Sequence, residues 1–344
     1  MGERPLTATY RLQLHADFTF TDAEHVVPYL ADLGVSHLYL SPILSAAPGS
    51  MHGYDVVDHG RVSEDLGGEP ALLSLADTAH AHGLGIVCDV VPNHMCIPEP
   101  EYLNRQLWDV LRHGREAPSA SWFDIDWDLL DGRLGLPVLG AALAEVIDAG
   151  ELVLDKVDTA GGSEAVLRYH GHVFPVADGT DDGSVADIAG RQHYLLGSWR
   201  DKRSLLSHRR FFDVDTLIAV RVEDPKVFDT SHSVLIDLHR RGVLDGFRID
   251  HPDGLADPEA YLARLAAATD GAWVVVEKIL EGNERLPQPW ATAGSTGYDA
   301  LNVIQTALAP RTGSRLDALW QAAGAEGEAA SAPSPWSSWP PSAR

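Results

Sequence analysis

Short apolar segments alternate with amphipathic ones over the first ninety residues, and this alternation predicts consecutive βα units around a parallel sheet. We expect strands at residues 7–14, 37–40 and 85–91, and helices at about 21–33 and 69–82. The third strand is apolar enough to be buried on both faces of the sheet.

The first helix carries recognisable start and stop signals. Thr21 followed by Glu24 has the spacing of a capping box, and Gly34 is placed to end the helix. Four apolar residues lie between these signals at helical spacing: Val26, Val27, Leu30 and Leu33.

The βα alternation stops after Pro92 and returns much later in the chain. Residues 96–210 contain short alternating pieces rather than βα units, so we interpret them as an inserted lobe. Beyond the lobe the pattern predicts helix 227–241, strand 245–249, helix 258–269 and strand 272–277, listed here in chain order.

These elements divide the chain into four parts. Residues 1–95 form the first part of a catalytic barrel, residues 96–210 the lobe, residues 211–322 further βα units of the barrel, and residues 323–344 a tail. The tail has many prolines and no apolar period, which indicates disorder or an out-of-frame translation. Five predicted strands cannot close an eight-stranded barrel. The fold is therefore either an incomplete (β/α)₈ TIM-type barrel or an unrelated open α/β fold.

Composition limits the partners more than the fold. The chain has 344 residues, 45% of them hydrophobic, and a formal charge of −24 from 50 acidic and 26 basic side chains. Such a charge repels nucleic acid and anionic membranes, so a neutral substrate is favoured. The two cysteines, Cys88 and Cys96, lack disulfide or metal spacing, and neither a signal peptide nor a membrane span is visible. We therefore expect a cytoplasmic protein without metal or cofactor.

Asp250 follows a predicted strand, and Arg248 lies two residues earlier on the same side of it. We expect the arginine to keep the carboxylate ionised, which suits a nucleophile at the carboxyl end of a barrel strand. A surface ion pair at the end of a strand is an equally good interpretation of this motif alone.

Glu277 closes the apolar run Trp273-Val274-Val275-Val276 of the next strand. A carboxyl that emerges from apolar surroundings favours its protonated form, as a general acid requires. A strand that simply reaches solvent at this residue explains the pattern as well.

Two loops add candidates for sugar binding. Asp89, Asn93 and His94 close the third strand with the donors and acceptors that suit sugar hydroxyls, although turn chemistry alone also explains Pro92-Asn93. Tyr54 follows the second strand, where its ring could support a pyranose or simply pack in the core.

Taken together, Asp89-x-x-x-Asn93-His94, Gly246-x-Arg248-x-Asp250 and Glu277 resemble the first three signature regions of the α-amylase family. The resemblance implies that Asp250 is the nucleophile, that Glu277 is the general acid/base, and that Arg248 tunes the nucleophile. It also places Tyr54, Asp89 and His94 around the attacked glucose.

Longer segments between about residues 7 and 320 resemble the maltooligosyltrehalose synthases of that family. They include His52-Gly53-Tyr54-Asp55, Arg209-Arg210-Phe211-Phe212-Asp213, Arg248-Ile249-Asp250-His251-Pro252-Asp253-Gly254 and Glu277-Lys278-Ile279-Leu280. This resemblance adds His251 to the substrate-binding candidates. It implies an intramolecular transglycosylation of a maltooligosaccharide or linear α-1,4-glucan, which converts the reducing-end α-1,4 bond to α-1,1 with retention. A trehalose-releasing hydrolase would take the product.

The family also carries a third acid on a seventh strand, and no segment after Glu277 resembles that region. We therefore expect an incomplete polypeptide that is weakly active or inactive by itself. An α-glucan hydrolase and a non-catalytic glucan-binding remnant remain alternative interpretations.

Overall fold

The computed structural model describes residues 5–159, 162–282, 284–308, 318–319 and 322. They fall into two compact units, which are described separately. The first consists of the described residues up to 278 and of 286–296, and the second of those in 279–285 and after 296. The predicted tail at 323–344 lies outside the described residues.

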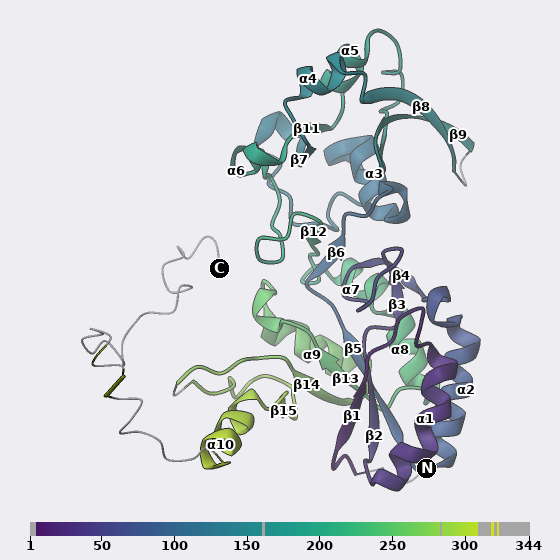
Figure 1. Cartoon of the computed structure of the whole chain (residues 1–344), viewed down its shortest axis with the longest axis vertical. Helices are drawn as coiled ribbons and strands as arrows, with labels where there is room; N and C mark the ends of the chain where they lie inside the picture. The colour runs from purple at the N-terminus through teal and green to yellow at the C-terminus, as the bar shows by residue number, and fades with distance from the viewer. Residues whose placement is uncertain (1–4, 160–161, 283, 309–317, 320–321, 323–344) are drawn as a thin grey trace. The chain divides into compact units, whose positions relative to one another are not determined.

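The first unit contains a six-stranded sheet in which every pair of neighbours is parallel (Figure 1). Its strands, in spatial order, are β1 (Thr9–Leu12), β2 (His37–Leu40), β5 (Gly85–Val90), β13 (Gly246–Ile249), β14 (Trp273–Val276) and β15 (Gly294–Ser295). This sequential parallel order is that of an incomplete (β/α)₈ barrel. The five predicted strands are present, β2 with the predicted bounds and the other four in shorter form, and the two-residue β15 is an addition to the prediction.

Helices follow the strands as the βα pattern predicts. They are α1 (Phe20–Leu33), α2 (Gly68–Ala81), α7 (Pro225–Ser231), α8 (Ser233–Arg240) and α9 (Pro258–Ala268). The predicted single helix 227–241 is wrong, because α7 and α8 are separated at His232. The buried His232 ring stacks on Phe228 and bonds the Tyr261 hydroxyl at 2.9 Å, contacts that hold this residue between the two helices.

The start of α1 also differs from the prediction. The capping residue is Thr19, whose backbone N–H and hydroxyl both donate to Asp22 Oδ2, at 2.8 and 2.7 Å. Glu24 instead accepts hydrogen bonds from Ser74 and Thr78 of α2, so it joins two helices rather than capping one. The buried face is formed by Phe20, Ala23, Val27 and Leu30, whereas Leu33 is 54% exposed.

Two short antiparallel pairs lie outside the main sheet. The hairpin of β3 (Leu44–Ala46) and β4 (Val56–Val62) follows β2, and sequence analysis did not predict it. The second pair joins β6 (His94–Cys96) to β12 (Leu217–Ala219). Because these two strands precede and follow the inserted segment, the pair brings both ends of the lobe together.

The lobe after the third sheet strand, β5, contains a three-stranded antiparallel sheet and a parallel pair. The three strands are β8 (Leu152–Thr159), β9 (Gly162–Tyr169) and β10 (His172–Pro175), and the pair is β7 (Leu134–Leu139) with β11 (Tyr194–Ser198). The helices are α3 (Arg105–His113), α4 (Leu143–Asp148), α5 (Val185–Gly190) and α6 (Lys202–Leu205). The lobe and the main sheet share one compact unit, so the boundaries at 96 and 210 remain a prediction.

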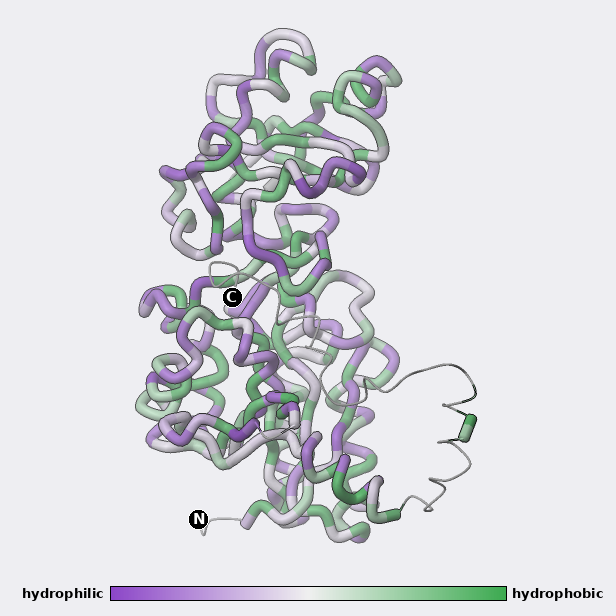
Figure 2. The backbone as a smooth tube through the Cα atoms, turned by 90° about the vertical axis from the view of Figure 1, so that its left-hand side faces the viewer, coloured by the Kyte–Doolittle hydropathy of each residue, from purple (hydrophilic) through white to green (hydrophobic). Residues whose placement is uncertain are grey.

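Hydrophobic and hydrophilic segments are interspersed along the backbone (Figure 2). One apolar core extends from Leu12 in β1 to Val276 in β14. The second unit contains α10 (Tyr298–Leu308). Within the part of the chain that the structure describes, no helix is long and apolar enough to cross a membrane.

Candidate active site

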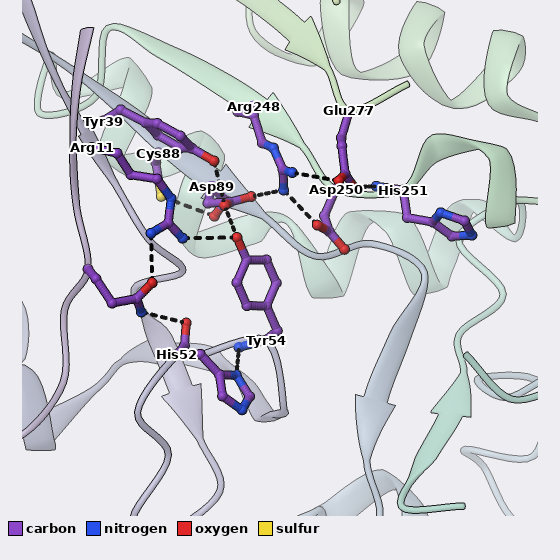
Figure 3. A network of polar contacts seen from close by, with 11 residues as sticks. Arg11, Tyr39, His52, Tyr54, Cys88, Asp89, Arg248, Asp250, His251 and Glu277 are labelled. Carbon is purple, nitrogen blue, oxygen red and sulfur yellow. Dashed lines mark hydrogen bonds and ion pairs between the residues drawn. The ribbon is translucent and has the colours of Figure 1, made fainter. Parts of the chain in front are cut away.

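Arg248 is the centre of a polar cluster at the carboxyl ends of three neighbouring strands (Figure 3). Its Nη1 donates to Asp89 Oδ1 at 2.8 Å and to Asp250 Oδ1 at 2.6 Å. Its Nη2 lies 3.3 Å from Glu277 Oε1. One guanidinium thus holds three carboxylates that are far apart in the sequence.

The sheet geometry explains this convergence. Arg248 is the direct register partner of Asp89, and both acids after β13 and β14 continue the pairing one residue beyond their strands. The Asp250 N–H donates to Val90 O at 2.9 Å, and the Glu277 N–H donates to Ile249 O at 2.8 Å. The backbone therefore fixes where each carboxylate leaves the sheet, at the rim where barrel enzymes build active sites.

The electrostatics of Asp250 correct one expectation. Burial raises the pKa of Asp250 to about 7, the charges of Asp89 and Glu277 add to this rise, and Arg248 opposes it. We expected Arg248 to keep this carboxylate ionised, but burial outweighs the arginine and the pKa of Asp250 is raised. The physical reason is that one positive charge is divided among three acids in a poorly solvated place.

Glu277 differs from the expectation in its surroundings. Its side chain is 22% exposed and faces Arg248, so its environment is less apolar than the preceding strand suggests. A backbone donor also holds it, because the His251 N–H lies 3.2 Å from Glu277 Oε2. His251 reaches this position with a φ of 41°, an uncommon left-handed conformation for a residue with a side chain.

Asp89 is buried more deeply than a residue lining an open subsite. It is 2% exposed, and besides Arg248 it accepts hydrogen bonds from the hydroxyls of Tyr39 at 2.8 Å and Tyr54 at 2.6 Å. Burial raises the pKa of Asp89, while Arg248 and the two tyrosines oppose this effect. In this arrangement Asp89 orients Arg248 and Tyr54, and its direct contact with a sugar stays a prediction.

Sequence analysis missed two members of this network, Arg11 and Tyr39. They are direct register partners on β1 and β2, and Arg11 Nη2 donates to the Tyr54 hydroxyl at 3.1 Å. Arg11 Nη1 also donates to Gln13 Oε1 at 2.6 Å. The available signal was the presence of large polar side chains at matching positions of adjacent strands.

Tyr54 is carried by the loop between β3 and β4. Gly53 allows the loop to turn, because its φ is 79° and an added Cβ would lie 2.8 Å from Pro42 O. Ser50 further ties the loop by accepting from the Gly53 N–H at 3.0 Å. The loop is thereby fixed with the Tyr54 ring directed toward Asp89 (Figure 3).

His94 and Asn93 lie beside the Arg248 cluster rather than within it. His94 Nε2 is 3.1 Å from Tyr54 O, and burial lowers the pKa of His94 to about 4, so the ring is neutral at pH 7. The Asn93 side chain accepts from Arg209 Nη1 at 3.1 Å, and this arginine also donates to Gly254 O at 2.7 Å. Arg209 thus links the lobe to two loops of the rim, a function that sequence analysis did not predict.

The described residues contain no group of three or more His, Cys, Asp or Glu side chains placed to hold a metal ion. The chemistry that the cluster offers is instead that of two acids joined through a guanidinium. Asp250 and Glu277, from adjacent strands, can act on one bond from neighbouring positions, and Arg248 sets the orientation of both.

The sequence of the chain is similar to those of known proteins. The α-amylase catalytic domain model matches residues 24–124. A putative maltooligosyl trehalose synthase of Mycobacterium tuberculosis is 44% identical over 329 residues, which are 94% of this chain and 41% of that protein. The chain therefore spans about two-fifths of the length of this relative.

Solved structures give the same result. The maltooligosyltrehalose synthase of Arthrobacter ramosus is 46% identical with a TM-score of 0.85, over 97% of this chain and 42% of that one. A hypothetical maltooligosyl trehalose synthase of Sulfolobus tokodaii is 37% identical with a TM-score of 0.79, over 92% of this chain and 41% of that one. Over this part of their length, the chain is similar in sequence and fold to maltooligosyltrehalose synthases, and its residues 24–124 match the α-amylase catalytic domain.

Proposed function

We propose that this chain carries the nucleophile and the general acid/base of a maltooligosyltrehalose synthase. The observation that carries the proposal is the contact of Asp250 and Glu277 with the same guanidinium at the carboxyl ends of adjacent parallel strands. The similarity to proteins named as maltooligosyltrehalose synthases supports the choice of substrate, a maltooligosaccharide or a linear α-1,4-glucan.

In this proposal Asp250 attacks the anomeric carbon on the non-reducing side of the last α-1,4 bond. The bond to the terminal glucose breaks while Glu277 gives its proton to the leaving oxygen, and a covalent glycosyl-enzyme forms. The freed glucose turns in place and offers its anomeric hydroxyl, from which Glu277 takes a proton. Two displacements at one carbon give an α-1,1 bond with retention, and no water is consumed.

The remaining residues position these two groups. Arg248 holds both carboxylates, Asp89 holds Arg248 and Tyr54, and the His251 N–H holds Glu277. Neutral His94 and the phenol of Tyr54 offer the donors and acceptors that suit sugar hydroxyls. Asn93 supports the rim through Arg209 and, with His251, remains a candidate for substrate contact.

We also propose a cytoplasmic location and a downstream trehalose-releasing hydrolase that consumes the product. Both cysteines are free and buried, which suits a reducing compartment. The formal charge of −24 disfavours nucleic acid and anionic membranes as partners.

A mechanism-based label tests the nucleophile without requiring full turnover. We expect a 5-fluoro maltosyl fluoride to add one glycosyl unit to the peptide that contains Asp250, as measured by mass spectrometry. Fluoride leaves without protonation, so Glu277→Gln should still be labelled, whereas Asp250→Asn should not. The labelling rate should rise with pH through about 7, because the attacking carboxylate must be ionised.

Label on another residue, or equal labelling of Asp250→Asn, would refute the assignment of the nucleophile. Incubation with maltopentaose then separates the reaction types. Loss of reducing ends without chain shortening indicates the synthase, whereas release of glucose indicates a hydrolase.

A further inference from the structure

Phe212 is an exposed aromatic residue in a strained conformation beside the candidate active site. Its side chain is 53% exposed, although it belongs to the segment that leads from the lobe back to the main sheet. Its φ is 51°, a left-handed value that is a genuine outlier for a bulky residue. Such strain costs free energy and persists where the surroundings enforce it, often at functional sites.

The Phe212 ring lies against two other rings of the site. It is 5.1 Å from the ring of His251 and 4.5 Å from that of Phe211, measured between ring centres. Phe211 in turn lies 4.4 Å from His94. His251, whose N–H donates to Glu277, therefore separates Phe212 from the proposed general acid/base by a single residue.

Ion pairs on both sides of Phe212 hold its loop in place. Arg209 pairs with Asp124 at 2.7 Å, in addition to its bonds with Asn93 and Gly254. Arg210 pairs with Asp213 at 2.7 Å and with Asp215. Lys202 adds contacts to the same two acids, at 3.1 Å to Asp213 and 3.3 Å to Asp215. An exposed ring on a loop held in this way is positioned before any ligand arrives.

We propose that Phe212 is a sugar-stacking platform that the segment after the lobe presents to the active site, and that it binds the apolar face of a glucose unit of an α-glucan. The proposal rests on the function proposed above, which it deepens by naming a specificity-determining residue. A flat aromatic face next to polar groups is what a pyranose requires, because the sugar has apolar faces and a polar edge.

The polar groups are present on the neighbouring loop. Asp253 lies two residues after His251 and is paired with Lys278 at 3.0 Å, immediately beyond Glu277. Asp253 and Lys278 are thus close in sequence to His251 and Glu277 and can bond sugar hydroxyls. Packing alone does not require the strained backbone, since an exposed ring gains little burial in return.

The test measures maltopentaose binding to the 344-residue chain by calorimetry, with melting temperatures recorded in parallel. We expect Phe212→Ala to raise Kd about tenfold and Phe212→Trp to change it by less than about threefold, because an aromatic face is retained. The matched control is Trp199→Ala, since Trp199 is an aromatic residue of the preceding lobe and has the same exposed fraction of 53%. That variant should bind as the unaltered chain does.

Phe212→Gly separates strain from stacking. Glycine adopts a positive φ without cost, so this variant should melt at a higher temperature than Phe212→Ala while binding equally weakly. If the Phe212 ring binds the sugar, relieving the backbone strain with glycine should not restore the affinity for maltopentaose that is lost with the ring.

Two outcomes overturn the proposal, and they are distinguishable. If the unaltered chain binds maltopentaose and Phe212→Ala binds it equally well, the platform is refuted while the proposed function stands. If the unaltered chain binds no maltopentaose, the proposed function is refuted together with the platform.

Discussion

A comparison of two clusters in which acidic side chains surround a basic one, the first at the rim of the sheet and the second in the lobe, separates a functional site from a structural one. At the rim, Arg248 faces Asp89, Asp250 and Glu277. In the lobe, His172 of β10 lies between Glu101 at 2.6 Å and Glu99 at 3.1 Å. Both clusters bury charge, but they differ in how completely their polar atoms are bonded.

The lobe cluster is closed. Glu101 is 0% exposed, and its two oxygens accept from His172 Nδ1 and from the Val173 N–H, each at 2.6 Å. In the rim cluster, by contrast, Arg248 Nε is buried without a hydrogen-bond partner among the described residues. A cluster whose buried polar atoms are all hydrogen-bonded stabilises the fold. A buried polar atom without a partner, beside several acids, is instead typical of a functional site.

The largest effect on stability should come from breaking the lobe cluster. Glu101→Ala leaves the His172 ring and the Val173 N–H buried without their acceptor, so we expect a loss of about 3–5 kcal/mol in the free energy of unfolding. Urea denaturation measures it. Glu99→Ala removes a carboxylate that is 55% exposed and serves as the control, with an expected change within about 1 kcal/mol. Similar losses for both variants would contradict the contrast drawn between the clusters.

At the rim, the replacement of an acid by Asp250→Asn should instead stabilise the chain above neutral pH. The pKa of Asp250 is raised from 3.8 to about 7 in the folded chain, so folding binds a proton between these values. The stability of the unaltered chain therefore falls as pH rises from about 4 to 7. Asp250→Asn lacks this fall. Between pH 4 and pH 8 we therefore expect the difference in unfolding free energy between this variant and the unaltered chain to shift by about 2 kcal/mol in favour of the variant.

Urea denaturation at pH 4, 6 and 8 checks this expectation. A constant difference between Asp250→Asn and the unaltered chain over this range would show that the Asp250 carboxylate is as well solvated in the folded chain as in the unfolded one. The rim would then resemble an ordinary surface ion pair.

The smallest effect should be the pH dependence of the lobe. Burial by itself lowers the pKa of His172, but hydrogen bonding to Glu101 and the charges of Glu101 and Glu99 raise it above 6.5. The stabilisation by the charged ring is complete below pH 6.5 and is lost as pH rises through the folded value. We expect this loss to be about 1 kcal/mol and to be absent in His172→Gln.

Proton NMR of the imidazole resonances checks this value directly, and His170→Gln is the matched control because that neighbouring ring is 66% exposed. A His172 midpoint at or below 6.5 would show that the imidazole does not carry the positive charge of the cluster.

Much of the fold could be predicted because buried parallel strands leave a strong pattern. Five strands and the lobe after the third one were predicted from apolar runs and from the break after Pro92. The strand β15 could not be predicted, since Gly294–Ser295 is two residues long and is defined only by its pairing with β14. The separation of α7 from α8 at His232 depends on a contact with Tyr261, which lies 29 residues away.

The site was predicted in part, for a related reason. Asp250 and Glu277 follow strands and Asp89 lies near the end of one, where an acid after an apolar run is conspicuous. Arg11 and Arg209 act through partners 43 and 116 residues away, Tyr54 and Asn93, and no local pattern encodes such distances. The raised pKa of Asp250 escaped prediction because it depends on the burial of the carboxyl and on the charges of acids from other strands.

The buried thiol of Cys88, next to Asp89, can report how often the sheet opens. Cys88 is 0% exposed in β5, the strand that carries Asp89, and burial raises the pKa of its thiol. A thiol reagent can modify Cys88 only when β5 separates from its neighbours. The modification rate therefore measures how often the floor of the site opens, and a glucan bound at the rim should slow that rate.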